Sequence, residues 1–128
     1  MTNDDLNAKT GAVADMILSS QKVVVFTGAG VSTESGIPDF RSPEGIWSKF
    51  DPDDFTIEKF LHNPETRKKQ WRILVEGGLI ADAKPNHAHL AIAELERLGK
   101  LDCVITQNID NLHQKAGNSP EKVIELHG

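Results

Sequence analysis

The sequence has little of several residue types, and each scarcity excludes a class of protein. The single cysteine, Cys103, excludes a disulfide framework, and its place in a predicted strand favours a small buried hydrophobic side chain. No apolar run approaches the roughly 20 residues of a membrane-spanning helix, so no membrane partner is expected. Lysine and arginine number 14 against 19 acidic residues, and the net charge of −5 disfavours direct binding of nucleic acid.

Metal ligands are equally scarce. With one cysteine and no histidine or carboxylate group at ligand spacing, no metal site is predicted. His87 and His89 are two positions apart and face different sides of a helix, which excludes them as a metal pair. The first residues, Met1 to Leu6, are acidic where a signal peptide is basic, so we expect a cytoplasmic protein.

The most informative stretch is residues 28–41, Gly-Ala-Gly-Val-Ser-Thr-Glu-Ser-Gly-Ile-Pro-Asp-Phe-Arg. It follows the apolar run Val23–Phe26, which is β-branched and aromatic, so we expect a strand buried on both faces, as in a parallel sheet. A Gly-x-Gly motif directly after such a strand lets the backbone approach a phosphate. Gly28 allows the tight turn, and Gly30 has no side chain to block a ligand.

The stretch departs from the ordinary dinucleotide-binding fingerprint. Thr33 occupies the place of the third glycine, and Gly36 and Pro38 follow shortly after. Because proline interrupts a continuing helix, we expect the helix that opens here to be short or broken. The acidic residues over 51–54 follow no predicted strand, so they are discounted as the ribose-binding acid of a dehydrogenase. A glycine-rich turn that binds no ligand stays open as an alternative at this point.

Apolar periodicity and capping residues predict the other elements. The predicted helices cover residues 3–20, 56–62, 63–76 with an end at Gly77-Gly78, 86–98 and a short segment over 112–116, and the predicted strands cover 22–27, 102–106 and 122–126. Two consecutive helices interrupt the alternation of strands and helices, so residues about 51–84 are predicted to be a helical insertion. The expected buried stripes are Leu6, Val13, Met16 and Ile17 in the first helix and Trp71, Leu74 and Val75 in the third.

Each predicted strand ends in a chemically distinctive motif. These motifs are Gly28-Ala29-Gly30, Gln107-Asn108-Ile109-Asp110 and His127. Because ligands bind beyond the carboxyl ends of an open parallel sheet, we expect the three motifs to meet there. A phosphate loop, amide side chains, one carboxylate and one imidazole suit a nucleotide whose ribose hydroxyl is activated by a base.

These motifs resemble those of the sirtuins, which are NAD-dependent protein deacylases. The matching segments are residues 28–41, Thr106–Asp110 and Glu125–Gly128, in the family's order, and the resemblance runs from about Val23 to Gly128. It implies an α/β fold, the first half of a doubly wound Rossmann-like parallel sheet, with NAD as the cofactor and an acylated-lysine protein or peptide as the partner. At the helix start near Asn86 it also implies that His89 is a packing or capping residue.

The resemblance implies the reaction as well. The acyl oxygen of a modified lysine attacks C1′ of the nicotinamide ribose as nicotinamide leaves, and a base then activates a ribose hydroxyl to complete acyl transfer. His127 is the implied base, and Asn108 orients the ribose or the attacking water. Asp110 holds the nicotinamide carboxamide, and Ser32 supports the ribose network.

The family pattern also assigns cofactor-binding residues. They are Gly28, Ala29, Gly30, Thr33, Ile37, Asp39, Phe40, Arg41, Gln107, Asn108, Ile109 and Asp110. In this pattern Phe40 shields the reacting carbon and Arg41 pairs with a phosphate. Taken singly, the residues have structural alternatives: a helix cap for Asp110, Ser32 and Thr33, a core position for Phe40, and a surface position for His127.

The chain also departs from the family pattern. Sirtuins carry a zinc module and a second half of the nucleotide fold after the His-Gly motif, so zinc is expected only in a segment beyond Gly128, and residues 1–128 are predicted to be an incomplete catalytic domain that is inactive alone. Two other functions stay open: a non-catalytic NAD-binding module, and protein ADP-ribosyl transfer by the same residues. The absence of tyrosine argues against an acid-acyl pocket and favours acetyl-lysine.

Overall fold

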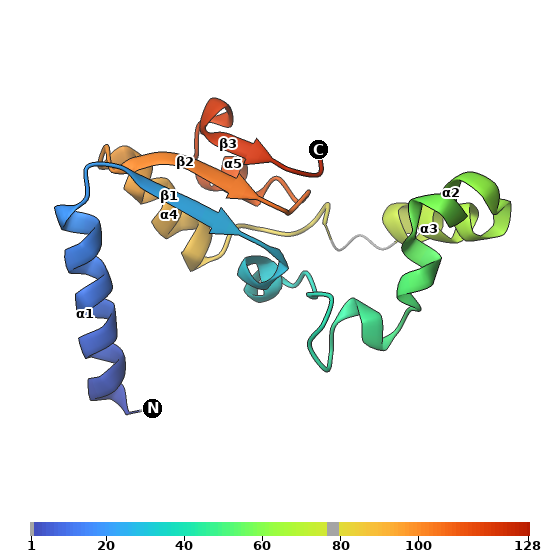
Figure 1. Cartoon of the computed structure of the whole chain (residues 1–128), viewed down its shortest axis with the longest axis horizontal. Coiled ribbons are helices and arrows are strands. Elements are labelled where there is room, and N and C mark those ends of the chain that lie inside the picture. The colour runs from blue at the N-terminus through green and yellow to red at the C-terminus, as the bar shows by residue number, and fades with distance from the viewer. Residues whose placement is uncertain (1, 77–79) are drawn as a thin grey trace.

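The structure is a computed structural model that describes residues 2–76 and 80–128. Its centre is a parallel sheet in the order β1-β2-β3, built from β1 (Val23–Thr27), β2 (Leu101–Thr106) and β3 (Val123–Glu125). In the register of the sheet, Ile105 of β2 lies between Phe26 of β1 and Ile124 of β3. Figure 1 shows the three arrows side by side and pointing the same way, so the predicted parallel α/β architecture is confirmed.

Helices and loops connect and flank the strands. The α-helices are α1 (Asn3–Ser19), α2 (Ile57–His62), α3 (Pro64–Glu76), α4 (His87–Arg97) and α5 (Leu112–Ala116), and the 3-10 segments are η1 (Ala29–Ser35), η2 (Ile46–Ser48), η3 (Pro52–Phe55) and η4 (Pro120–Lys122). The predicted helices and strands are therefore present with small shifts at their ends. The predicted helix end at Gly77-Gly78 lies outside the described residues.

Helix α4 covers one face of the sheet and forms the core with it. Ile92 of α4 clusters with Leu101 and Val104 of β2 and with Val123 of β3. Val104 and Leu112, the first residue of α5, have no exposed surface. This small core fixes the strand ends from which the site is built.

The predicted start and end of α4 are confirmed. The side-chain oxygen of Asn86 accepts hydrogen bonds from the N–H groups of Ala88 at 2.9 Å and His89 at 3.4 Å. In return, Nδ1 of His89 accepts from the N–H of Asn86 at 3.2 Å, and the ring is fully buried. Gly99 follows the helix with φ +72°, a conformation that glycine adopts without strain. His89 is thus the packing and capping residue that the resemblance implied.

Strand β1 is buried on one face only, so the predicted burial on both faces is wrong. It is an edge strand in the described sheet, and Val25 packs against the core beneath it. On the opposite face Val24 is 54% exposed and Phe26 is 61% exposed. Cys103 on β2 is half-buried, not fully buried as predicted. An apolar strand sequence makes both faces of the strand apolar, but each face is buried only where another helix or sheet packs on it.

Two of the predicted buried stripes are exposed for the same reason. Helix α1, capped by Thr2, has no buried residue, and Thr66 is the buried residue of α3. The predicted stripe residues that are at least 45% exposed are Leu6, Val13 and Met16 in α1 and Trp71, Leu74 and Val75 in α3. The helical periodicity was interpreted correctly, whereas the inferred burial of these faces was wrong.

The segment η3–α2–α3 is held together mainly by polar contacts and lies to one side of the sheet (Figure 1). Asp54 forms an ion pair with Lys69 at 2.7 Å. The guanidinium of Arg67 donates to the carbonyl oxygens of Phe60 at 2.8 Å and Leu61 at 3.1 Å, near the end of α2. These bonds satisfy carbonyl groups that the short helix leaves without partners.

Candidate functional site

The carboxyl ends of the strands meet at one edge of the sheet. The N–H of Gln107 donates to the carbonyl of Thr27, and the N–H of Leu126 donates to the carbonyl of Thr106, both at 3.0 Å. These two bonds continue the backbone hydrogen bonding between neighbouring strands one residue beyond the strand ends. The loops that begin at Gly28 and Gln107, and the turn that carries His127, therefore leave the sheet together, as the sequence predicted.

The loop after β1 begins as a short 3-10 helix, which confirms the expected interruption of a regular helix. Gly28 precedes η1 in an extended conformation, and Gly36 ends it with φ +86°. The first hydrogen bond of η1 runs from the N–H of Val31 to the carbonyl of Gly28, which leaves the N–H groups of Ala29 and Gly30 outside the i→i+3 pattern. A Cβ at Gly30 would meet nothing within 4 Å, so the backbone is open to a ligand there.

Three predicted site residues form a polar cluster, in which Ser32 and Asp110 are buried and Asn108 is partly exposed. The hydroxyl of Ser32 donates to Oδ2 of Asp110 at 2.6 Å, and Nδ2 of Asn108 lies 3.2 Å from the same hydroxyl. The Asn108 amide also donates to the carbonyl of Gly28 at 3.0 Å, which ties the two loops together. Ser32 is 1% exposed and Asp110 is 6% exposed. A short bond from a hydroxyl to a buried carboxylate is among the stronger protein hydrogen bonds.

The capping alternative for Asp110 is also confirmed. Its Oδ1 accepts from the N–H of Leu112 at 3.0 Å, at the start of α5. Thr33 makes a local bond as well, from its hydroxyl to the carbonyl of Gly30 at 2.9 Å. Gln107 lies over Gly28, where an added Cβ would contact its side chain at 3.9 Å, and Ile109 is 51% exposed.

The remaining predicted residues lie in the loop after η1. Ile37 begins this loop, and the Asp39 side chain accepts from the N–H of Ser42 at 3.1 Å. The ring of Phe40 packs against Trp47 with centroids 5.2 Å apart, and Phe40 is 45% exposed, so its alternative as a core residue is wrong. Arg41 is exposed beside it.

His127 lies in the turn directly after β3, with its side chain exposed. Its location agrees with the prediction that the three motifs meet at this edge of the sheet. Its exposure agrees with the alternative that it is a surface residue. The role of His127 as a base stays a prediction.

Sequence reasoning missed a second polar cluster beneath the first. The hydroxyl of Thr27 donates to Oγ1 of Thr106 at 2.9 Å and lies 2.9 Å from Nε2 of His113. All three side chains are at most 7% exposed. This contact could not be predicted from local sequence patterns, because Thr27 is 79 residues from Thr106 and 86 residues from His113 in the chain.

The rings of His89 and His113 lie edge to face with centroids 5.0 Å apart. Burial lowers the pKa of both imidazoles, because a charged ring loses its hydration there; the His89 ring lowers the pKa of His113 further, and the carboxylate of Asp110 opposes both shifts. Nε2 of His89 and Nδ1 of His113 are buried without a protein partner. Both rings are therefore neutral at pH 7.

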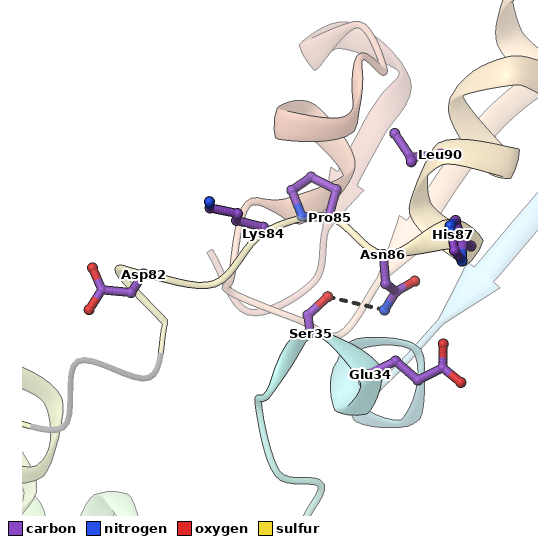
Figure 2. Close-up of a pocket in the computed structure, with 8 residues that line it drawn as sticks. All are labelled: Glu34, Ser35, Asp82, Lys84, Pro85, Asn86, His87 and Leu90. Carbon is purple, nitrogen blue, oxygen red and sulfur yellow. Dashed lines mark hydrogen bonds between the residues drawn. The ribbon is translucent and has the colours of Figure 1, made fainter.

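Asn86 connects α4 to the loop over residues 28–41, which is called the cofactor loop below. Its Nδ2 donates to the carbonyl of Val31 at 2.7 Å and to Oγ of Ser35 at 3.1 Å. Figure 2 shows the second bond among the residues that line a surface hollow beside η1. The hollow is lined by Glu34, Ser35, Asp82, Lys84, Pro85, Asn86, His87 and Leu90.

The described part of the chain has neither a metal-ligand cluster nor a membrane-spanning helix. Among residues 2–76 and 80–128, no group of three or more histidine, cysteine or acidic side chains is arranged to hold a metal ion. The described helices include none with the length and apolar character needed to cross a membrane.

Comparison with known proteins gives consistent matches over nearly the whole chain. A model of the Sir2 family matches residues 28–128. NAD-dependent protein deacetylase 1 of Pyrobaculum aerophilum is 52% identical over 128 residues, which is 99% of this chain and 47% of that protein. NAD-dependent protein deacetylase 1 of Bradyrhizobium diazoefficiens is 49% identical over 125 residues, which is 97% of this chain and 48% of that protein.

Solved structures agree with the sequence relatives. A structure described as a Sir2 homologue–NAD complex is 44% identical with a TM-score of 0.76, and the match covers 92% of this chain and 45% of that one. A structure of Sir2 bound to acetylated peptide is 42% identical with a TM-score of 0.75, covering 92% and 44%. The chain thus spans about half the length of the relatives it matches. With motif, fold and relatives in agreement, the chain belongs to the Sir2 family.

Proposed function

We propose that the intact protein is an NAD-dependent protein lysine deacetylase that binds the nicotinamide nucleotide at this edge of the sheet. The observation that carries the proposal is the polar cluster of Ser32, Asn108 and Asp110 at the strand ends of a Sir2-family chain. The relatives named as deacetylases support the activity. An acylated-lysine protein or peptide is the proposed substrate, supported by the neighbour with bound acetylated peptide.

The residues present fit an NAD molecule. The N–H groups of Ala29 and Gly30 lie outside the η1 hydrogen-bond pattern and suit a phosphate, and the open space at Gly30 leaves room for it. The exposed guanidinium of Arg41 is a second phosphate partner. Phe40, half exposed and supported by Trp47, offers an aromatic face near the ribose.

When bound, NAD supplies a ribose carbon from which nicotinamide departs. In this proposal the Asp110 carboxylate places negative charge in a buried site, where it favours developing positive charge on a sugar. Its orientation is fixed by Ser32 and by the N–H of Leu112. Asn108, anchored on the carbonyl of Gly28, orients the ribose or the attacking water in this proposal. His127 removes the proton of a ribose hydroxyl.

Three further statements are part of the proposal. Residues about 51–84, which contain η3, α2 and α3, form a helical insertion beside the cofactor loop, and residues 1–128 form an incomplete catalytic domain. The steps proposed for these residues use their own side chains and backbone, and zinc is proposed only for a segment after Gly128. We place the protein in the cytoplasm; the single cysteine supports a reducing compartment, and fractionation of cells tests this placement.

The test is release of nicotinamide from NAD with an acetyl-lysine peptide by the intact protein and by His127→Ala. Wild-type protein is expected to release nicotinamide and deacetylate the peptide. The variant is expected to keep most of its NAD affinity and to lose about 10²–10⁴ in turnover, because the base acts after binding. His62→Ala, an exposed histidine on α2, is the matched control and is expected to retain turnover.

Each alternative function has its own outcome in the same assay. NAD binding without nicotinamide release would indicate a non-catalytic module. Nicotinamide release with transfer of labelled ADP-ribose to protein, and no deacetylated peptide, would indicate an ADP-ribosyltransferase. Equal loss of NAD affinity and turnover in His127→Ala would show that His127 is structural.

A further inference from the structure

We propose that His113 is a positioning residue of the nucleotide site, acting through a closed ring of hydrogen bonds that joins the ends of β1 and β2 to the Ser32–Asp110 pair. The inference rests on the proposed function, because it assigns His113 a part in holding that site for its nucleotide. His113 lies on α5 and is 1% exposed, and its ring is hydrogen-bonded to Thr27, which is not among the residues predicted to touch NAD.

The ring begins at His113. Its Nε2 lies 2.9 Å from Oγ1 of Thr27, and the Thr27 hydroxyl donates its only proton to Oγ1 of Thr106 at 2.9 Å. The contact between Nε2 of His113 and the Thr27 hydroxyl joins α5 to the pair of threonines at the strand ends.

From Thr106 the ring passes to the site. Oγ1 of Thr106 accepts from the N–H of Asn108 at 3.1 Å, and Nδ2 of Asn108 reaches Oγ of Ser32 at 3.2 Å. Ser32 donates to Asp110 at 2.6 Å, and Asp110 accepts from the N–H of Leu112, the neighbour of His113, at 3.0 Å. The path therefore returns to its starting point. Loss of one member leaves buried polar groups unpaired and frees both loops to shift.

His89 supports the same arrangement from the other side. Its Nδ1 accepts from the N–H of Asn86, so its own proton is on Nε2, and Asn86 in turn holds the carbonyl of Val31 next to Ser32. The two ring centroids are 5.0 Å apart, and each ring has one buried nitrogen without a protein partner. A second proton on either ring would place a charge in a buried site, and the Asp110 carboxylate only partly offsets the lost hydration.

The experiment compares ADP-ribose affinity and thermal unfolding of the intact protein with those of His113→Phe, His113→Gln and Thr27→Val. Titration calorimetry is done well below each unfolding midpoint, so only folded protein is compared. His113→Phe and Thr27→Val are each expected to weaken ADP-ribose binding about tenfold, because each opens the ring at one bond. His113→Gln, whose amide can donate from nearly the place of Nε2, is expected to bind within about threefold of wild type.

Two further variants make the result decisive. The double variant Thr27→Val with His113→Phe is expected to bind ADP-ribose about as tightly as whichever single variant binds it less tightly. The reason is that both substitutions break the same hydrogen bond, between Thr27 and His113. His62→Phe, on the exposed surface of α2, is the control for the introduced ring and is expected to bind as wild type does.

The outcomes separate the inference from the function on which it rests. Folded His113→Phe or Thr27→Val that binds ADP-ribose as tightly as wild type, or additive effects in the double variant, overturns the inference alone. Wild-type protein that binds no ADP-ribose overturns the proposed function together with the inference. If His113→Phe does not fold, the near-isosteric Thr27→Val and the His113→Gln variant still decide between a positioning role and none.

Discussion

Acidification from about pH 7.5 to about pH 5.5 is expected to destabilise this protein through two buried imidazoles. Burial lowers the pKa of His89 and of His113 from the ordinary value of 6.5. In this window the unfolded chain takes up protons at both histidines, while the folded chain takes up fewer, because burial lowers the pKa of both rings. Stability therefore rises with pH here, is complete above about pH 6.5, and is lost as the pH falls toward the lowered folded pKa.

The magnitude follows from the linkage relation. A histidine that titrates at its ordinary pKa only in the unfolded chain changes the free energy of unfolding by up to about 1.4 kcal/mol between these two pH values. The pair therefore accounts for up to about 2.7 kcal/mol, a large part of the stability of a typical domain. The carboxylate of Asp110 favours the charged rings and reduces this figure. The Ser119 hydroxyl is the main cause of the lowered pKa of Glu96. The stability that Glu96 contributes is therefore lost only below its unfolded pKa of 4.5, which lies outside this pH range.

The assay is chemical denaturation at both pH values for the intact protein and for His89→Gln with His113→Gln. The double variant has no titrating ring at these sites, so most of the pH dependence in this window is expected to disappear. His62→Gln, which removes an exposed histidine, is expected to retain it. Wild-type stability that is level or increases on acidification, or imidazole proton resonances of His89 and His113 that titrate near pH 6.5, would refute the reasoning.

Three other predictions follow from separate contacts. Glu96→Ala is expected to lower the free energy of unfolding by about 1–2 kcal/mol in denaturation experiments, because Asn118 and Ser119 lose their shared acceptor, whereas Glu94→Ala on the same helix has a much smaller effect. NADP is expected to bind more weakly than NAD in titrations, because Arg41 is the one basic residue over 28–41 to meet a second phosphate group. Residues 1–128 expressed alone are expected to associate in gel filtration through the exposed edge of β1, less so with Phe26→Lys, and to release no nicotinamide.

The strand-end motifs could be predicted because their signals are local. A glycine-rich sequence after an apolar run marks the turn, and Pro38 marks the interruption that the structure shows as the short segment η1. The rule that parallel strands present their carboxyl ends at one edge then brings Gly28, Asn108 and His127 to that edge without knowledge of any contact. The bond between Ser32 and Asp110 is consistent with that prediction but could not be derived from it.

Burial could not be predicted in the same way. The alternation and periodicity of apolar residues identify which face of a strand or helix is apolar, but they do not show that another layer covers it. Val24, Phe26 and Trp71 lie on such faces and are more than half exposed in the described chain.

The two interpretations of Asp110 turn out to be complementary. The sequence presented a helix cap and a site carboxylate as alternatives, yet Oδ1 accepts from the N–H of Leu112 while Oδ2 accepts from Ser32. A carboxylate has two oxygens, so one bond does not compete with the other. The cap fixes the rotation of the carboxylate plane, and that rotation points Oδ2 at Ser32. Asp110→Ser removes both carboxylate oxygens and is therefore expected to lose the bond to the N–H of Leu112 and the bond from Ser32 together. A residue at the start of a short helix can in this way be structural and functional through the same geometry.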